Sequence, residues 1–276
     1  MKRVCLKHGL SLVALLGVLL WSSGCATAPE TGRRQMILLS ASEEMQLGLT
    51  EFEKLKQDVP VSKDQAAKAM VERVGRRIAA VAPLPNAQWE FVLFQSDEAN
   101  AFCLPGGKVG VYTGILPVTK AEAGLATVIG HEVAHATARH GAERMSSAMV
   151  LQTGGQLASS ALGGENGKYS ETVGAAYGIG SQVLVALPHS RTQESEADHI
   201  GLLYMARAGY DPAEAVAFWE RFAKFNEEAG GGGDLWFLRT HPLDAKRIAD
   251  LKALLPRARA EYEKTLATQK PAGGGQ

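Results

Sequence analysis

The residues His131 to His135 form an H-E-x-x-H sequence, with Glu132 directly after the first histidine. Four residues turn an α-helix by about 400°, so both imidazoles project from one face, about 40° apart, and can bind the same metal ion. Zinc lowers the pKa of a bound water to about 7. A carboxylate beside that water can accept its proton as the water attacks a peptide carbonyl. The motif therefore predicts zinc-dependent peptide hydrolysis, with one zinc ion per chain, His131 and His135 as ligands and Glu132 as the general base.

The residues around this motif are mostly apolar, which predicts that the helix is buried: Leu125, Val128, Ile129, Val133 and Ala134. Buried histidine and glutamate side chains need polar or charged partners, and one metal ion can satisfy several of them. The alternative is an exposed helix that carries two histidines by chance. The apolar surroundings favour the metal site.

A catalytic zinc ion usually has three protein ligands and one water, so a third ligand is required. The extended pattern H-E-x-x-H-x-x-G-x-x-H is excluded, because Ala138 stands at its glycine place and Gly141 at its last histidine place. His140 is five residues after His135, which turns its side chain about 140° away on a continuous helix. We therefore do not expect His140 to bind the metal.

A later segment, residues 190–208, has a helical pattern and carries acidic residues at a suitable spacing. Glu194 and Asp198 are four residues apart and share one helix face. We predict that Glu194 is the third zinc ligand. We predict that Asp198 accepts the remaining N–H of a ligating histidine, as the outer residues of metal sites commonly do. Glu196 is the rival ligand, and a solvated acidic helix start is the alternative to any metal role.

Hydrophobic periodicity and turn residues predict an α+β fold that is mainly α-helical. Strands are expected at 89–94 and 108–113, and the second is expected at a sheet edge because of glycines within and next to it and a nearby proline. The Gly- and Ser-rich segment 153–180 is either a flexible loop, which could form a lid over the zinc, or a pair of closely packed helices. The expected helices start at Ser42 and at Tyr210-Asp211-Pro212, or cover about 62–81, 120–143, 190–208 and 243–265.

The first 24 residues are predicted to be a secretory signal. A basic start precedes an apolar run at 10–21, which is shorter than the roughly 20 residues needed to span a membrane. Small residues and Cys25 follow. This pattern resembles a bacterial lipoprotein signal with lipidation at Cys25, although Ser22 stands where leucine is usual. The residue after this cysteine is Ala26 and not aspartate. By the sorting rule of enterobacterial lipoproteins, this resembles a protein that is delivered to the outer membrane. The alternative is an ordinary signal cleaved near Ala26 or Ala28.

Composition limits the class of protein. The 276 residues include 29 basic and 29 acidic side chains, 46% are hydrophobic, and the formal net charge is zero. A disordered chain would have fewer apolar residues, and a nucleic-acid-binding domain would have an excess of positive charge, so neither is expected. We predict a tether over 25–40, one catalytic domain over 41–265 and a flexible tail over 266–276. No intramolecular disulfide is expected, because Cys103 has no partner apart from the lipidated cysteine.

Together these residues resemble the M48 family of zinc metallopeptidases, whose signature combines H-E-x-x-H with a distant E-x-x-x-D. The likeness extends from about Arg34 to Arg247, over most of the mature chain. It rests on the following residues: His131, Glu132, His135, Glu194 and Asp198; Ser190-Arg191 and Ala197; Asn100-Ala101-Phe102 and Pro105-Gly106-Gly107; Gly209-Tyr210-Asp211-Pro212; His241-Pro242 and Arg247.

This resemblance implies a zincin-type fold in which the edge strand of a small sheet lies beside the active-site helix. It implies the same three zinc ligands and the same general base. It also implies that His241 and Arg247 stabilise the tetrahedral oxyanion or hold the substrate; in some relatives a histidine at this place caps the zinc in a latent state. Substrate would add as a strand beside Val109 and Val111, near Asn100. Alternatively, His241 and Arg247 pair with a carboxylate, and Asn100 caps a turn.

Within the family, the chain looks most like the short lipoprotein branch, because it shows neither a second membrane segment nor a repeat of about 34 residues. The resemblance implies a lipid-anchored endopeptidase on the periplasmic face of the Gram-negative outer membrane. Its substrates would be unfolded or misfolded envelope proteins, and the outer-membrane assembly machinery would be a partner. The alternative is a chaperone-like assembly lipoprotein with a latent zinc site. No nucleic-acid partner is expected.

Overall fold

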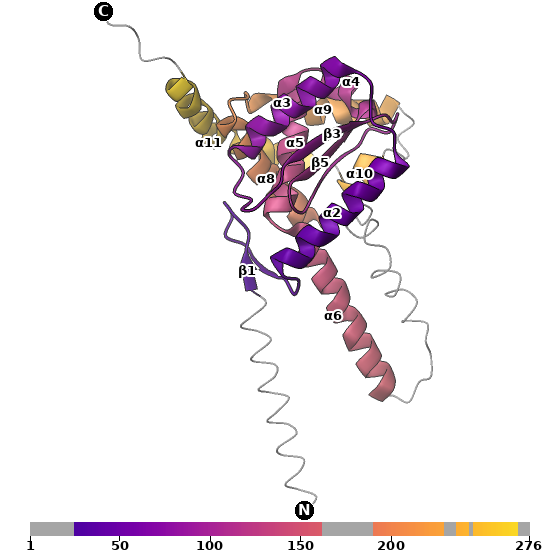
Figure 1. Cartoon of the computed structure of the whole chain (residues 1–276). Coiled ribbons are helices and arrows are strands. Elements are labelled where there is room, and N and C mark those ends of the chain that lie inside the picture. The colour runs from indigo at the N-terminus through magenta and orange to yellow at the C-terminus, as the bar shows by residue number, and fades with distance from the viewer. Residues whose placement is uncertain (1–24, 162–189, 229–235, 243–244, 270–276) are drawn as a thin grey trace, which may run out of the picture.

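The computed structural model describes residues 25–161, 190–228, 236–242 and 245–269 (Figure 1). Among these described helices, no segment combines the length and the apolar character that a bilayer span requires. The strands are β1 (Cys25–Thr27), β2 (Arg34–Met36), β3 (Glu90–Phe94), β4 (Ala101–Leu104) and β5 (Lys108–Tyr112). The helices are α2 (Ala41–Asp58), α3 (Gln65–Ala79), η1 (Thr113–Ile115), α4 (Leu116–Thr119), α5 (Glu122–Thr137), α6 (His140–Ala161), α8 (Arg191–Arg207), α9 (Ala213–Glu228), α10 (Trp236–Thr240) and α11 (Ala245–Gln269).

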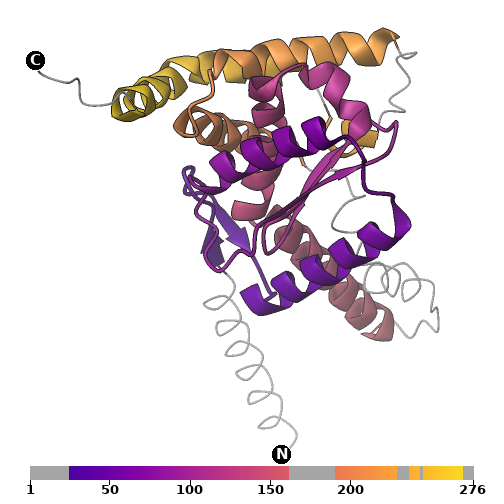
Figure 2. The same ribbon diagram turned by 45° about the horizontal axis from the view of Figure 1, so that its top comes forward.

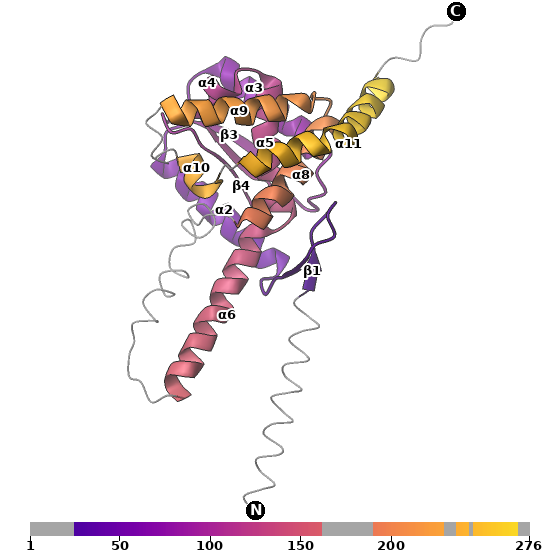
Figure 3. The same ribbon diagram turned by 180° about the vertical axis from the view of Figure 1, so that it is seen from behind.

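Helix α5 carries the H-E-x-x-H sequence and runs through the centre of the fold. The sheet lies on one side of it, and α8, α9 and α11 lie on the other (Figures 1 and 3). Every residue of α5 from Gly124 to His135 is buried, which confirms the predicted burial of this helix. The apolar face of α3, formed by Val71, Val74 and Ile78, joins the same core. Helix α3 packs along β3, whereas α2 packs against β4 and β5 (Figure 2).

The main sheet has three strands in the order β3-β5-β4, with β5 parallel to β3 and antiparallel to β4. The prediction of an edge position for β5 is therefore wrong, because it is the central strand. The physical reason lies at Gly110, where a Cβ atom would lie 2.2 Å from the ring of Phe102 on β4. The glycine makes room for an aromatic side chain of the neighbouring strand. The strand that lies at the edge, beside α5, is β4.

The ends of α5 and α8 position the polar residues of the site. The segment predicted as one helix over 120–143 is two helices, because Arg139 adopts a φ of 56° between α5 and α6. Helix α6 therefore starts at His140 in a new direction. Helix α8 begins and ends as predicted, with Ser190 as its N-cap and Gly209, at a φ of 78°, after its last turn.

The segment predicted as a tether forms a structured hairpin of the antiparallel strands β1 and β2. Ile37 is 6% exposed, and Nε2 of Gln35 donates a hydrogen bond of 2.7 Å to the carbonyl of Ala138 at the end of α5. The cap of helix α2 lies two residues earlier than predicted. It is Ser40, not Ser42, because the Ser40 hydroxyl accepts a backbone N–H of the first turn.

Several predictions concern residues that lie wholly or partly outside the described part of the chain. The signal, residues 1–24, is one of them, and residues 162–189 include most of the Gly- and Ser-rich segment and its suggested lid. Helix α11 extends to Gln269, so the first part of the predicted tail is helical, and 270–276 lie outside. Cys103 carries a free thiol within the described residues.

Candidate metal centre

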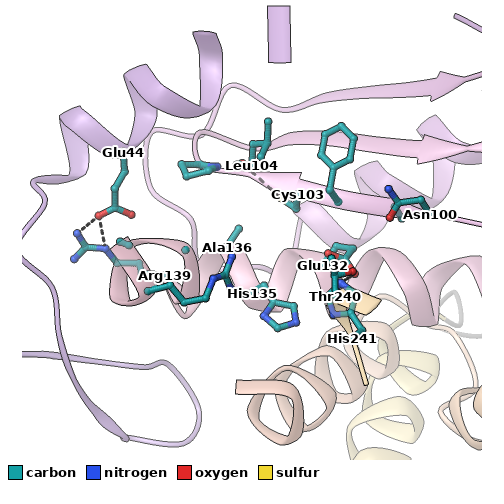
Figure 4. A pocket seen from close by; sticks show the side chains of 16 residues that line it. Glu44, Asn100, Cys103, Leu104, Glu132, His135, Ala136, Arg139, Thr240 and His241 are labelled. Atoms are coloured by element: carbon teal, nitrogen blue, oxygen red, sulfur yellow. Dashed lines mark hydrogen bonds and ion pairs between the residues drawn. The ribbon is translucent and has the colours of Figure 1, made fainter. Parts of the chain in front are cut away.

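Four buried side chains from three parts of the chain converge beside α5. His131 and His135 belong to α5, Glu194 to the first turn of α8, and His241 directly follows α10. One ligand atom from each residue lies within 4.8 Å of the others. Glu132, His135 and His241 gather beneath β4 (Figure 4). The structure thus brings together the three predicted ligands and adds His241 to them.

The separations of these ligand atoms suit a tetrahedral metal ion. Nε2 of His131 is 3.1 Å from Nε2 of His135 and 3.3 Å from Nδ1 of His241. Oε1 of Glu194 is 3.3 Å from Nε2 of His135 and 3.0 Å from Nδ1 of His241. Its Oε2 is 3.4 Å from Nε2 of His131. Four ligands at about 2.0–2.1 Å from a zinc ion lie about 3.3 Å apart, so this nitrogen and oxygen set fits a zinc-type cation.

Two glycines allow α5 and α8 to approach closely enough for these ligands to meet. A Cβ atom on Gly201 of α8 would lie 2.8 Å from the backbone nitrogen of His131. A Cβ atom on Gly130 of α5 would lie 3.0 Å from the carbonyl oxygen of Gly201. A larger residue at either position would push the helices apart, since the surrounding core is close-packed.

His131 is oriented by a buried carboxylate. Its Nδ1 lies 3.0 Å from Oδ1 of Asp198, and Asp198 accepts two hydrogen bonds of 2.8 Å from the guanidinium of Arg247. Arg247 also pairs with Glu194 at 3.0 Å and lies over the ring of Trp219. Asp198 therefore stands where an acceptor for the spare N–H of a ligating histidine is needed. Arg247 pairs with carboxylates, which was the alternative to its predicted contact with the oxyanion or substrate.

His135 has a different outer partner, which the sequence analysis missed. Its Nδ1 lies 2.7 Å from Nδ1 of His140, and Nε2 of His140 lies 2.9 Å from Oε2 of Glu196. His140 was expected to point away because it was treated as part of the same helix. The break at Arg139 turns it back toward His135. No sequence signal marks this break, because a positive φ at a residue other than glycine, asparagine or aspartate is uncommon.

Burial and the neighbouring charges set the protonation of the site. Burial lowers the pKa of His135 well below its usual value, which keeps the ring neutral as a metal ligand must be. Burial alone would raise the pKa of Glu194, but the facing histidines hold it well below its usual value. Against the effect of burial, the facing carboxylates of Asp198 and Glu194 raise the pKa of His131 to about 9. Burial raises the pKa of Glu132, toward the range in which a general base is effective.

The catalytic candidate Glu132 faces a cleft between α5 and the edge strand β4 (Figure 4). Its Oε1 makes no hydrogen bond to the described residues and lies 3.4 Å from Nε2 of His241. Asn100, just before β4, lines the same cleft. Val109 and Val111 do not: both are 0% exposed in the core, and β4 covers their strand on this side. Because β5 is paired with β3 on one edge and β4 on the other, Val109 and Val111 offer no free strand edge, and the prediction that substrate adds beside them is wrong.

A buried H-E-x-x-H helix, joined by a glutamate from a second helix, is the arrangement of a zincin-type metallopeptidase. Peptidase family M48 matches residues 65–255, so the chain belongs to this family, as predicted.

The chain spans about half the length of the curated relatives it matches. The named relatives are metalloendopeptidases or proteases. Mitochondrial metalloendopeptidase OMA1 of Schizosaccharomyces pombe is 39% identical over 193 residues, which cover 70% of this chain and 54% of that protein. The Arabidopsis thaliana protein of the same name is 34% identical over 235 residues, 84% of this chain and 44% of its own length. Beta-barrel assembly-enhancing protease of Escherichia coli is 28% identical over 231 residues, 82% of this chain and 46% of its own length.

Proposed function

We propose that the protein is a zinc-dependent endopeptidase that cleaves unfolded or misfolded proteins of the cell envelope. The observation that carries this proposal is the set of three nitrogens and one carboxylate, at tetrahedral separations, beside the buried carboxylate of Glu132. Such a set would hold one zinc ion through His131, His135 and Glu194. A bound zinc ion would supply a Lewis acid and lower the pKa of water to about 7.

In this mechanism Glu132 accepts the proton of the attacking water and later delivers it to the leaving amine. Burial raises its pKa, which favours acceptance of the proton. Asp198 and Arg247 hold the ring of His131, so the ligand does not need to reorient during the reaction. His241 lies between Glu132 and Glu194, at 3.4 Å and 3.0 Å, and can donate a hydrogen bond to the oxyanion once it turns from Glu194.

Substrate would lie in the cleft as an added strand along β4. Within the described residues β4 pairs with β5 alone, so its other edge has backbone N–H and C=O groups for a peptide. The cleft is lined by all four residues of β4 and by the residues just before and after it, which supports this position: Asn100, Ala101, Phe102, Cys103, Leu104 and Pro105. A strand that binds through its backbone accepts many side chains, which suits an enzyme that acts on unfolded chains.

We further propose that Cys25 carries a lipid and anchors the enzyme to the periplasmic face of the outer membrane. The sequence before it supports an exported lipoprotein, with a basic start, a short apolar run and small residues. The name of the Escherichia coli relative refers to β-barrel assembly, which supports envelope proteins as substrates and the assembly machinery as a partner. Mass spectrometry of the N-terminal peptide from the expressed protein would test the anchor, and an unmodified Cys25 would contradict it.

The central test is Glu132→Gln, which removes the proton acceptor and leaves the ligands intact. We expect the variant to retain zinc and to lose cleavage of a denatured outer-membrane protein by at least about 100-fold. Peptides released from a denatured envelope extract, compared between the two proteins by mass spectrometry, would give activity and specificity together. Unchanged cleavage would refute the mechanism.

A second function is favoured by one observation. His241 occupies the fourth corner of the ligand set, where water must bind in an active enzyme. If His241 held the fourth coordination position permanently, the protein would be a chaperone-like assembly lipoprotein with a latent zinc site. The variant His241→Ala separates the two: increased cleavage identifies His241 as a cap, and reduced cleavage identifies it as part of the catalytic machinery. Absence of cleavage in both proteins, with aggregation of unfolded substrate still suppressed, supports the chaperone.

A further inference from the structure

The N-terminal hairpin reaches the metal site through one arginine in the turn between β1 and β2. Nε of Arg33 donates a hydrogen bond of 2.6 Å to Oε2 of Glu196. Its two terminal nitrogens bind both oxygens of Glu143, at 2.6 and 2.8 Å. The hydroxyl of Thr31 donates to the other oxygen of Glu196. The side chain of Glu196 is 4% exposed, so the hairpin supplies two hydrogen bonds to a buried carboxylate of α8.

Glu196 is connected to a metal ligand through one other side chain. Oε2 of Glu196 lies 2.9 Å from Nε2 of His140, and Nδ1 of His140 lies 2.7 Å from Nδ1 of His135. When Nε2 of His135 faces a metal, its Nδ1 carries the proton and must donate it. Nδ1 of His140 must then accept, which leaves the proton of His140 on Nε2, opposite the carboxylate. Every donor in this chain therefore meets an acceptor.

We propose that Arg33 is a positioning residue for the metal centre: by holding Glu196, it fixes the tautomer and ring orientation of His140 and, through it, of the ligand His135. This inference rests on the metal centre of the proposed function. It assigns to the hairpin the role that Arg247 has for the other histidine ligand. Loss of such outer partners commonly weakens metal binding by about 10–100-fold.

Arg33 lies outside the part of the chain that matches the peptidase family. The family match covers residues 65–255, which include His140 and Glu196 but not the hairpin. A segment outside the matched peptidase region therefore completes the hydrogen-bond chain of one ligand. Cys25 lies on β1 of the same hairpin, so the predicted lipid attachment and the metal ligand are joined by one small structural unit.

The test measures metal binding by the whole chain, not its proteolytic activity. Metal-free wild type and Arg33→Gln are titrated with Zn²⁺ against a chelating indicator, and the absorption spectrum of the Co²⁺ form reports ligand geometry. Arg34→Gln is the matched control, because Arg34 is the exposed neighbour and its loss changes the charge equally. We expect Arg33→Gln to bind Zn²⁺ about 10–100-fold more weakly and to change the Co²⁺ spectrum. Arg34→Gln should match wild type in both.

Two further variants separate positioning from simple attachment of the hairpin. Glu143→Gln weakens the attachment but leaves the hydrogen bond from Arg33 to Glu196, so it should alter the Co²⁺ spectrum less than Arg33→Gln does. Glu196→Gln should weaken Zn²⁺ binding as Arg33→Gln does. The double variant Arg33→Gln/Glu196→Gln should be no weaker than the weaker single variant, because both break one chain.

The outcomes that overturn the proposal are distinct from those that overturn the function. Wild-type affinity and an unchanged Co²⁺ spectrum in Arg33→Gln overturn the positioning role, and equal effects of Glu143→Gln and Arg33→Gln do so as well. If metal-free Arg33→Gln does not fold, as judged by thermal melting, Arg33→Lys is measured instead and is expected to show the same direction of change. A wild-type chain that binds neither Zn²⁺ nor Co²⁺ refutes the proposed metal centre itself.

Discussion

The two histidines of α5 that we propose as metal ligands are held from opposite sides by different kinds of structure. On one side, His131 contacts Asp198, and Asp198 contacts Arg247; the side chains of both outer residues are 4% exposed. On the other side, His135 contacts His140 and then Glu196, and the chain ends at Arg33, whose side chain is 25% exposed. The first support is part of the core. The second ends in a surface hairpin that lies outside the matched family region.

This difference indicates which parts of the centre are fixed by folding and which can be altered separately. Asp198 and Arg247 belong to α8 and α11, which pack together on one side of α5 (Figure 3). They cannot separate unless much of the core opens. Of the hairpin residues 25–36, Ala28 alone belongs to the described hydrophobic core, so we expect detachment of the hairpin to leave the helices folded while the surroundings of His135 change.

The largest expected effect that would test this comparison comes from Arg247→Met. It leaves the carboxylates of Asp198 and Glu194 buried without their cation, and breaking a buried ion pair costs about 3–5 kcal/mol of unfolding free energy. Arg33→Met should cost less, because Arg33 and Glu143 are partly in contact with water and the buried Glu196 keeps its contacts with Thr31 and His140. Urea unfolding of the metal-free proteins measures both losses. Equal losses would contradict the division into a core support and a surface support.

The residues that hold His131 can be predicted in part from the sequence, whereas those that hold His135 cannot. The spacing of Glu194 and Asp198 places both on one face of α8 without any knowledge of tertiary structure, and the structure sets both beside the H-E-x-x-H helix. His140 depends on the backbone angle of Arg139, and Arg33 depends on a hairpin in a segment whose small and polar residues favoured a tether. The positions of His140 and Arg33 follow no helix or strand period, so residue spacing in the sequence does not predict them.

The order of the strands in the sheet was also not predictable from the local sequence. Glycine in a strand often marks an edge or a bulge, and this reasoning placed β5 at the edge. In the structure Gly110 is instead covered by Phe102 of the neighbouring strand. The mainly helical α+β class, which was predicted from local helix and strand patterns, is confirmed. The small sheet beside the H-E-x-x-H helix, which the family resemblance implied, is confirmed as well. Strand order depends on side-chain contacts between distant residues, which local composition does not contain.

A smaller effect is expected where α5 and α8 approach each other. Gly201→Ala places a methyl group 2.8 Å from the backbone nitrogen of His131, so the helices must separate, at a cost of about 1–3 kcal/mol. Gly130→Ala meets its neighbour at 3.0 Å and should cost less. Thr192→Ala, at an exposed position of α8, is the control and should be nearly neutral. Thermal melting gives the order of the three, and a neutral Gly201→Ala would show that close packing of these helices does not set the ligand positions.

The smallest effect concerns the surface side and depends on pH. Burial alone would raise the pKa of Glu143, but hydrogen bonds from Arg33 and Gln193 hold it below the usual value of 4.5. A carboxyl group whose pKa is lowered by folding stabilises the folded state above its ordinary pKa, and this contribution is lost as pH falls through the folded-state value. Wild type should therefore exceed Glu143→Gln in unfolding free energy by about 1 kcal/mol at pH 7, and the difference should shrink as the pH falls below 4.5.

Urea unfolding at a series of pH values, with and without Arg33→Gln, would measure this difference and its origin. Because Arg33 is the cation that lowers the pKa of Glu143, most of the pH-dependent difference should disappear in the Arg33→Gln background. It should persist in the Arg247→Met background, since Arg247 contacts Asp198 and Glu194 on the other side of the centre. A difference that survives Arg33→Gln unchanged would mean that Glu143 acts through Gln193 and α8, and that the hairpin has no energetic link to the metal centre at this residue.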